Sequence, residues 1–63
     1  MNLYFKDSNS DKVLYGADEG FVPNIGDEVR IYGKWFKVES RAFFCDSDDP
    51  EYCCVVWVEE CDK

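Results

Sequence analysis

The stretch that decides the fold is residues 21–38, FVPNIGDEVRIYGKWFKV. Its first part bends the chain, because the residue before Pro23 is biased toward extended conformations and residues 24–27, NIGD, are rich in turn formers. The β-branched and aromatic residues that follow do not have helical spacing. The stretch therefore predicts a turn that leads into β-structure.

A two-stranded hairpin is expected directly after this turn. Apolar and polar residues alternate over residues 28–32, which predicts a strand with Val29 and Ile31 facing the core. Gly33 and Lys34 then suit a two-residue connection, with glycine first as in a type II′ turn.

The returning strand of the hairpin should span residues 35–44. Its core face would carry Phe36, Val38, Ser40, Ala42 and Phe44, and its other face Trp35, Lys37, Glu39, Arg41 and Phe43. This alternating run is longer than a typical strand. A bend or bulge is therefore expected near Ser40, as small barrels require where a strand turns a corner.

Shorter strands flank the hairpin on both sides. Residues 2–6 and 12–15 predict an N-terminal hairpin across the polar loop of residues 7–11, closed by Gly16. Residues 53–60 predict a last strand that is apolar on both faces. Such a strand usually lies in the middle of a sheet or between two layers.

Together these segments predict a single all-β domain over residues 1–63. Five short strands favour a small, antiparallel, strongly bent sheet that curls into a partly open barrel, with no helix longer than one turn. So short a chain has only marginal stability, so most of its aromatic residues must help to fill or cover the core. The expected core is Leu3, Phe5, Val13, Tyr15, Val29, Ile31, Phe36, Val38, Phe44, Val56 and Val58.

Residues 22–38 combine an apolar-Pro turn, Ile-Gly-Asp, an alternating strand, a glycine turn and an aromatic-Lys-Val strand. This pattern resembles SH3-like barrel domains, in particular small uncharacterised proteins of bacteriophages and bacteria. The resemblance implies an SH3-like barrel architecture. SH3-like barrels that bind proline-rich peptides use an aromatic groove with acidic loops, but their full motif has no residue-by-residue match in this chain.

The chain is strongly acidic. Fourteen Asp and Glu against seven Lys and Arg give a formal net charge of −7, which disfavours a protein that tracks nucleic-acid phosphates and favours a basic partner. No apolar run reaches the length of a membrane helix, and the N-terminus lacks the basic start and apolar core of a signal peptide. We therefore expect a cytoplasmic protein without membrane contact, in which most cysteines are reduced.

Four cysteines, Cys45, Cys53, Cys54 and Cys61, allow three interpretations. A zinc site is disfavoured because no CxxC pair is present and adjacent cysteines of a strand point to opposite faces. A disulfide between Cys45 and Cys53 would require their Cα atoms to lie opposite each other across a hairpin. The third interpretation is a set of reduced thiols, with Cys54 as a small core residue.

An acidic loop before the last strand contains Asp46, Asp48, Asp49 and Glu51. Calcium prefers carboxylate oxygens, but the spacing and the glycine of an EF-hand are absent, which favours a solvated loop without a metal. The chain has no histidine, and no Ser or Cys stands beside a candidate general base. We therefore expect neither an enzyme nor a bound cofactor.

Basic and aromatic residues share the outer face of the predicted hairpin. They are Arg30, Tyr32, Trp35, Lys37, Arg41 and Phe43, with Trp57 from the last strand. Three roles are open for them: to cover a second small core or a subunit interface, to contact a protein partner, or to bind single-stranded nucleic acid. The net charge disfavours the last.

These features favour a small acidic protein-binding module that acts on a basic partner surface. In one version it is a phage-type inhibitor or nucleic-acid mimic, whose carboxylates imitate phosphates. The candidate partner-binding residues are Tyr32, Trp35, Phe43, Trp57, Asp46, Asp48, Asp49 and Glu51. Self-association through exposed tryptophans would use the same face. The alternative function is single-stranded nucleic-acid binding through the basic and aromatic residues.

Overall fold

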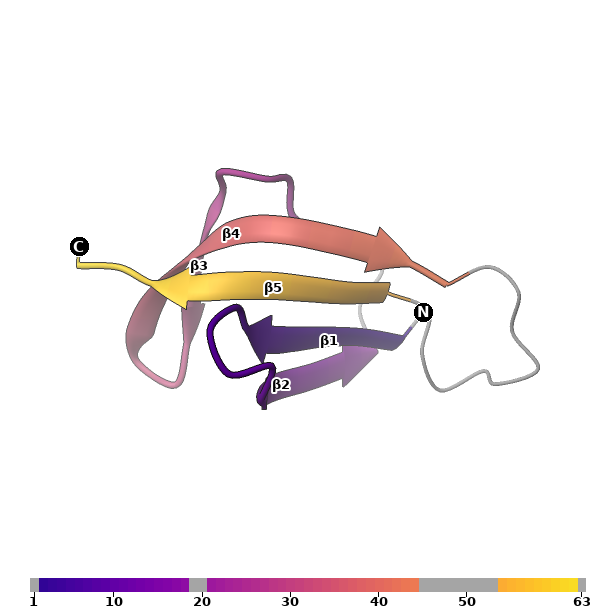
Figure 1. Cartoon of the computed structure of the whole chain (residues 1–63), viewed down its shortest axis with the longest axis horizontal. Coiled ribbons are helices and arrows are strands. Elements are labelled where there is room, and N and C mark those ends of the chain that lie inside the picture. The colour runs from indigo at the N-terminus through magenta and orange to yellow at the C-terminus, as the bar shows by residue number, and fades with distance from the viewer. Residues whose placement is uncertain (1, 19–20, 45–53, 63) are drawn as a thin grey trace.

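The computed structural model describes residues 2–18, 21–44 and 54–62, and within these ranges it contains strands and no helix. The strands are β1 (Asn2–Asp7), β2 (Val13–Asp18), β3 (Glu28–Ile31), β4 (Lys34–Phe43) and β5 (Cys54–Glu60) (Figure 1). The all-β prediction is confirmed. None of the described residues belongs to a helix that is long and apolar enough to cross a membrane.

All five strands belong to one mixed sheet with the order β2-β1-β5-β4-β3. β1 pairs with β2 and β4 with β3 and β5 in antiparallel fashion, whereas β1 and β5 are parallel. The prediction of a purely antiparallel sheet is therefore wrong. Parallel neighbours need a long crossover, and here the chain between β1 and β5 supplies it. Local turn signals predict hairpins between consecutive strands and give no indication of such a crossover.

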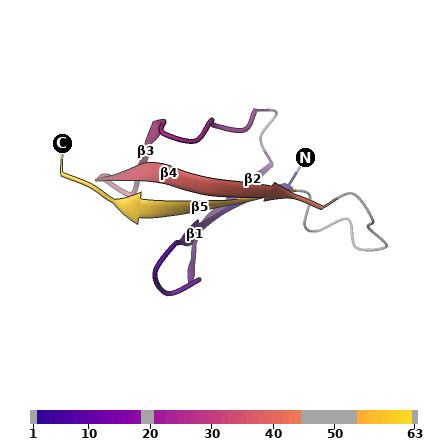
Figure 2. The ribbon, with the colours of Figure 1, turned by 45° about the horizontal axis from the view of Figure 1, so that its top comes forward.

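The sheet is strongly curled, so that β3, which pairs with β4, lies behind β4 and β5 in the view of Figure 1; Figure 2 shows the same curl from another side. The result is a half-barrel whose two sheet edges are β2 and β3. β5 occupies the centre of the sheet, as its two apolar faces predicted. Cys54, Val56 and Val58 are buried on the core face, and Val55 is buried on the outer face.

The core contains most of the residues that the alternation predicts. Leu3, Phe5, Ile31, Phe36, Val38, Val56 and Val58 are buried in one cluster, and Val29 packs against it. Burying each such side chain contributes roughly 1.5–3 kcal/mol. Val22 also packs against this cluster, and Pro23 is buried, so the predicted turn covers part of the core.

A register irregularity in β2 changes which of its residues reach the core. Phe5 pairs with Tyr15 but Lys6 pairs with Val13, so Leu14 is the extra residue of a bulge. Leu14 packs against the core, whereas Val13 is 48% exposed and Tyr15 stays at the margin, 39% exposed, with its ring 6.2 Å from that of Phe5. The assignment of Val13 and Tyr15 to the core is therefore wrong.

A second bulge lies in β4, where it was expected near Ser40. Val38 pairs with Val58 and Ser40 with Trp57, so Glu39 is the extra residue. An extra residue moves every later side chain to the opposite face, because strand side chains alternate.

The face assigned to the last part of this strand is therefore wrong. Arg41 lies opposite Val56 and Phe43 opposite Cys54, which places both on the core side. Phe44 follows the end of β4 and is exposed.

The β3–β4 turn is displaced by one residue from its predicted position. Ile31 pairs with Lys34, and the two residues between them, Tyr32 and Gly33, have φ angles of 50° and 81°. Positive φ at both central positions defines a type I′ turn, so the predicted type II′ turn at Gly33 and Lys34 is wrong. Both registers leave Val29 on the core face, so apolar alternation does not distinguish them.

Hydrogen bonds between the preceding bend and β4 favour the observed hairpin register over the predicted one. The Val38 N–H donates to the Asp27 carbonyl oxygen at 2.9 Å, and the Gly26 N–H donates to the Val38 carbonyl oxygen at 2.9 Å. Asp27 also accepts a hydrogen bond from the Asn24 N–H at 2.8 Å through Oδ2. These bonds extend the observed hairpin register beyond β3 and fix the bend against β4.

Candidate partner-binding groove

The four aromatic residues predicted to contact a partner do not form one surface. Trp35 and Trp57 are half-buried on the outer face, the side of the sheet opposite the core. Phe43 is exposed on the core side of the sheet, beyond the bulge of β4, and Tyr32 is exposed in the β3–β4 turn. The predicted acidic residues Asp46, Asp48, Asp49 and Glu51 lie outside the described residues, as do Cys45 and Cys53.

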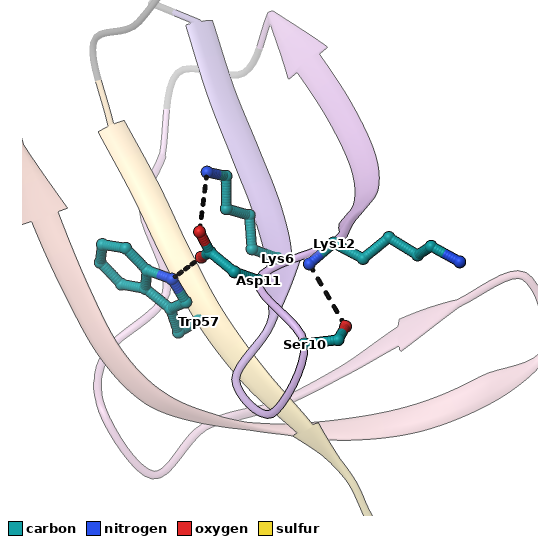
Figure 3. Close-up of polar contacts among 5 residues, drawn as sticks. All are labelled: Lys6, Ser10, Asp11, Lys12 and Trp57. Carbon is teal, nitrogen blue, oxygen red and sulfur yellow. Dashed lines mark hydrogen bonds and ion pairs between the residues drawn. The ribbon is translucent and has the colours of Figure 1, made fainter.

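Trp57 is held by the loop that joins β1 and β2. Its Nε1–H donates to Oδ1 of Asp11 at 2.8 Å, and the other carboxylate oxygen of Asp11 lies 3.7 Å from Nζ of Lys6 (Figure 3). The loop is closed by the Asp7 N–H, which donates to the Lys12 carbonyl oxygen at 2.8 Å. The indole of Trp57 thus has a structural role on the outer face.

The two arginines of the predicted basic and aromatic face also make contacts within the chain. Nη1 of Arg41 donates to the Pro23 carbonyl oxygen at 3.1 Å and to Oδ1 of Asn24 at 3.2 Å, which ties the bend to β4. The guanidinium of Arg30 lies 5.9 Å from the ring centroid of Trp35, within cation–π range. Because of these contacts, the guanidinium groups of the two arginines are less available to bind nucleic-acid phosphates.

A groove of about 490 Å³ lies where β1 and β5 end and the β3–β4 turn begins. We call it the acidic groove; it is lined by Asp7, Asn9, Leu14, Ile31, Tyr32, Lys34, Phe36, Glu59 and Glu60. Its apolar lining comes from core residues and its carboxylates from the ends of β1 and β5. Nζ of Lys34 lies 4.0 Å from Oε1 of Glu60, and both side chains are mostly exposed.

The carboxylates at this end of the sheet repel one another. A hydrogen bond with Glu39 and the charge of Glu39 raise the pKa of Glu59 above its ordinary value of 4.5. Partial desolvation and the charge of Asp7 act in the same direction. Like charges disfavour the ionised form, so the carboxylates of Glu39 and Asp7 both favour protonation of Glu59.

A second groove of about 360 Å³ continues along β3. We call it the apolar groove; it is lined by Leu3, Phe5, Tyr15, Phe21, Glu28, Val29, Arg30 and Ile31. Ile31 lines both grooves. The rings of Tyr15 and Tyr32, one from each groove, meet edge to face at a centroid distance of 5.9 Å.

Sequence reasoning identified Tyr32 but missed the other polar residues of the acidic groove. Asp7 was assigned to the polar loop of residues 7–11, and Glu59 and Glu60 were assigned to the last strand without a binding role. A signal was present, because both strands end in carboxylates. Using that signal would have required knowing that the two strands are parallel neighbours.

Among the described residues, no three Cys, Asp or Glu side chains form a potential metal-binding group. Cys54 is buried on the core face, and Cys61 is half-buried. Comparisons with protein-family models, with curated proteins and with solved structures give no match to this chain.

Proposed function

We propose that this chain is a small acidic protein-binding module whose acidic groove receives Lys or Arg side chains from a basic partner surface. The observation that carries the proposal is the combination of carboxylates and apolar residues in one groove. Asp7, Glu59 and Glu60 contribute negative charge, while Ile31 and Phe36 contribute apolar surface. Long basic side chains need both, since they bury their apolar stems and keep the charged group at a polar rim.

Two further features support a cationic ligand. Tyr32 is 83% exposed beside the carboxylates, so its ring can contact a guanidinium or ammonium group. The pair between Lys34 and Glu60 is solvent-exposed and long, and such pairs contribute little stability. A partner cation can therefore replace Lys34 at small cost.

The net charge of −7 supports the same class of partner by long-range attraction. It disfavours nucleic acid, and the contacts of Arg30 and Arg41 within the chain point the same way. In one version of the proposal the chain is a phage-type inhibitor that acts in the cytoplasm, and its carboxylates imitate nucleic-acid phosphates. The proposal also includes the fold family: the half-barrel is SH3-like, as the sequence pattern of residues 22–38 suggests.

The test is a titration of the protein with a fluorescent peptide that combines Val and Arg or Lys residues, at low ionic strength. Glu60→Gln should weaken binding by about threefold, the effect expected of an exposed charge pair. Lys34→Gln should strengthen it by removing the competing cation. The matched control is Asp18→Asn, which removes one carboxylate charge at the opposite end of the sheet and should leave affinity nearly unchanged.

Three results would contradict the proposal. The first is equal weakening by Glu60→Gln and Asp18→Asn, which would mean that only overall charge matters. The second is tighter binding of a single-stranded oligonucleotide with a steep salt dependence. The third is concentration-dependent sedimentation of the protein alone together with no peptide binding, which would indicate self-association instead.

A further inference from the structure

The edge strand β3 runs along both grooves. It lies at one end of the strand order, and among the described strands it pairs with β4. In a hairpin closed by a two-residue turn, Ile31 and Lys34 exchange both backbone hydrogen bonds, and the next pair along the ladder, Arg30 and Trp35, does not. The N–H and C=O groups of Arg30 therefore point away from β4, toward the open side of the half-barrel.

The grooves follow this edge in order. The apolar groove accompanies residues 28–31, and the acidic groove begins at Ile31 and continues past Tyr32. Every second side chain of a strand faces the same side. An extended segment that runs along β3 in the same direction would thus place its first side chains in the apolar groove and a later one in the acidic groove.

We infer that the partner contributes an extended segment that pairs with β3 as an additional strand, its apolar side chains in the apolar groove and a following Lys or Arg in the acidic groove. This inference rests on the proposed function and specifies how the partner binds. Backbone hydrogen bonds to the edge strand give affinity in this mode of recognition, and the pockets for alternate side chains give specificity. The segment would lie over Tyr15 and Tyr32, whose rings meet where the grooves join.

The net charge of the chain favours a segment of another protein over a second copy of this chain as the occupant of the grooves. Two copies would each bring a net charge of −7 to the interface and place like charges around the acidic groove. A segment with Lys or Arg after alternating apolar residues offsets the repulsion that Asp7 and Glu39 exert on Glu59. The occupant is therefore a basic, strand-forming segment of another protein.

The experiment uses the peptide acetyl-Thr-Val-Thr-Val-Thr-Arg-Thr-Lys-amide and two N-methylated forms of it. One form carries the methyl groups on the amides of both valines, and the other on the amides of the threonines that follow them. Alternate amides of an added strand point toward and away from the edge it pairs with. One methylated form should therefore lose affinity by roughly tenfold and the other should bind nearly as well as the parent peptide.

Amide exchange provides an independent readout. In the complex with the parent peptide, the Arg30 N–H should exchange more slowly, because it gains a hydrogen-bond partner, while the amide of Val13 in the opposite edge strand β2 should not change. Equal affinity of both methylated peptides, or loss of both, would overturn strand addition and leave the proposed function intact if Glu60→Gln still weakens the parent peptide. Failure of the parent peptide to bind would contradict the proposed function as well.

Discussion

Replacing Tyr32 with Asn should stabilise the folded chain and at the same time weaken binding of the basic peptide. Tyr32 has a φ angle of 50°, in the left-handed region where an L side chain costs roughly 1 kcal/mol or more. Asn tolerates this region, and Asn followed by Gly33 is the preferred pair for a type I′ turn. Because Tyr32 is 83% exposed, its removal sacrifices little apolar burial.

The loss that opposes this gain is the contact with Tyr15. The two rings meet at 76° with centroids 5.9 Å apart, and an edge-to-face pair contributes about 0.5 kcal/mol at the low end, where exposed pairs belong. The net stabilisation by Tyr32→Asn should be about 0.5 kcal/mol, which corresponds to roughly 2–4 °C in Tm for so small a domain. In a Tyr15→Ala background the contact is already absent, so the gain should rise to about 1 kcal/mol.

Urea and thermal unfolding measure these differences, and peptide binding is measured on the same samples. Tyr32→Ala is the control, because Ala retains the left-handed penalty and should not stabilise the chain in either background. If Tyr32→Asn destabilises the chain as much as Tyr32→Ala does, the turn does not have positive φ at this residue. If Tyr32→Asn leaves peptide affinity unchanged, Tyr32 does not contact the ligand.

Two further predictions concern the core and the carboxylates. Val38→Ala should lower the free energy of unfolding by about 1–4 kcal/mol, because Val38 is fully enclosed, whereas Val13→Ala should change it by no more than about 0.5 kcal/mol in urea unfolding. Glu39→Gln should make the chain more stable than the parent at neutral pH. Because the pKa of Glu59 is raised in the folded state, the contribution of Glu59 to folding stability is present below pH 4.5 and is lost as the pH rises through the folded-state pKa. Parent and variant should therefore converge in acid, and a constant difference at all pH values would contradict this origin.

The part of the fold that follows from local alternation was predictable. Residues 54–58 are apolar on both faces, and this predicted the central position that β5 occupies. Phe36 and Val38 were placed correctly because they precede the bulge of β4. Within such an uninterrupted strand, burying one residue determines the face of the others, so little tertiary information is needed.

Local alternation did not predict which face of the sheet the residues at and after the two bulges occupy. A bulge near Ser40 was expected from strand length, but the sequence does not show which residue is extra, and that choice reverses the face of Phe43. In β2 the extra residue Leu14 brings its own side chain to the core and leaves Val13 in solvent. Both outcomes depend on the neighbouring strand, since a bulge is defined by two residues opposing one.

The acidic groove was not predictable because it depends on the direction in which β1 pairs with β5. In the parallel arrangement Asp7 lies opposite Val58, so the carboxylate that ends β1 comes next to Glu59 and Glu60, which end β5. An antiparallel arrangement would have placed Asp7 beside the start of β5, at the other end of the sheet. The charge cluster beside Tyr32 therefore results from the one pairing in the sheet that local sequence does not encode. Disrupting the pairing of β1 with β5 would separate the carboxylates of the acidic groove even if every strand still formed.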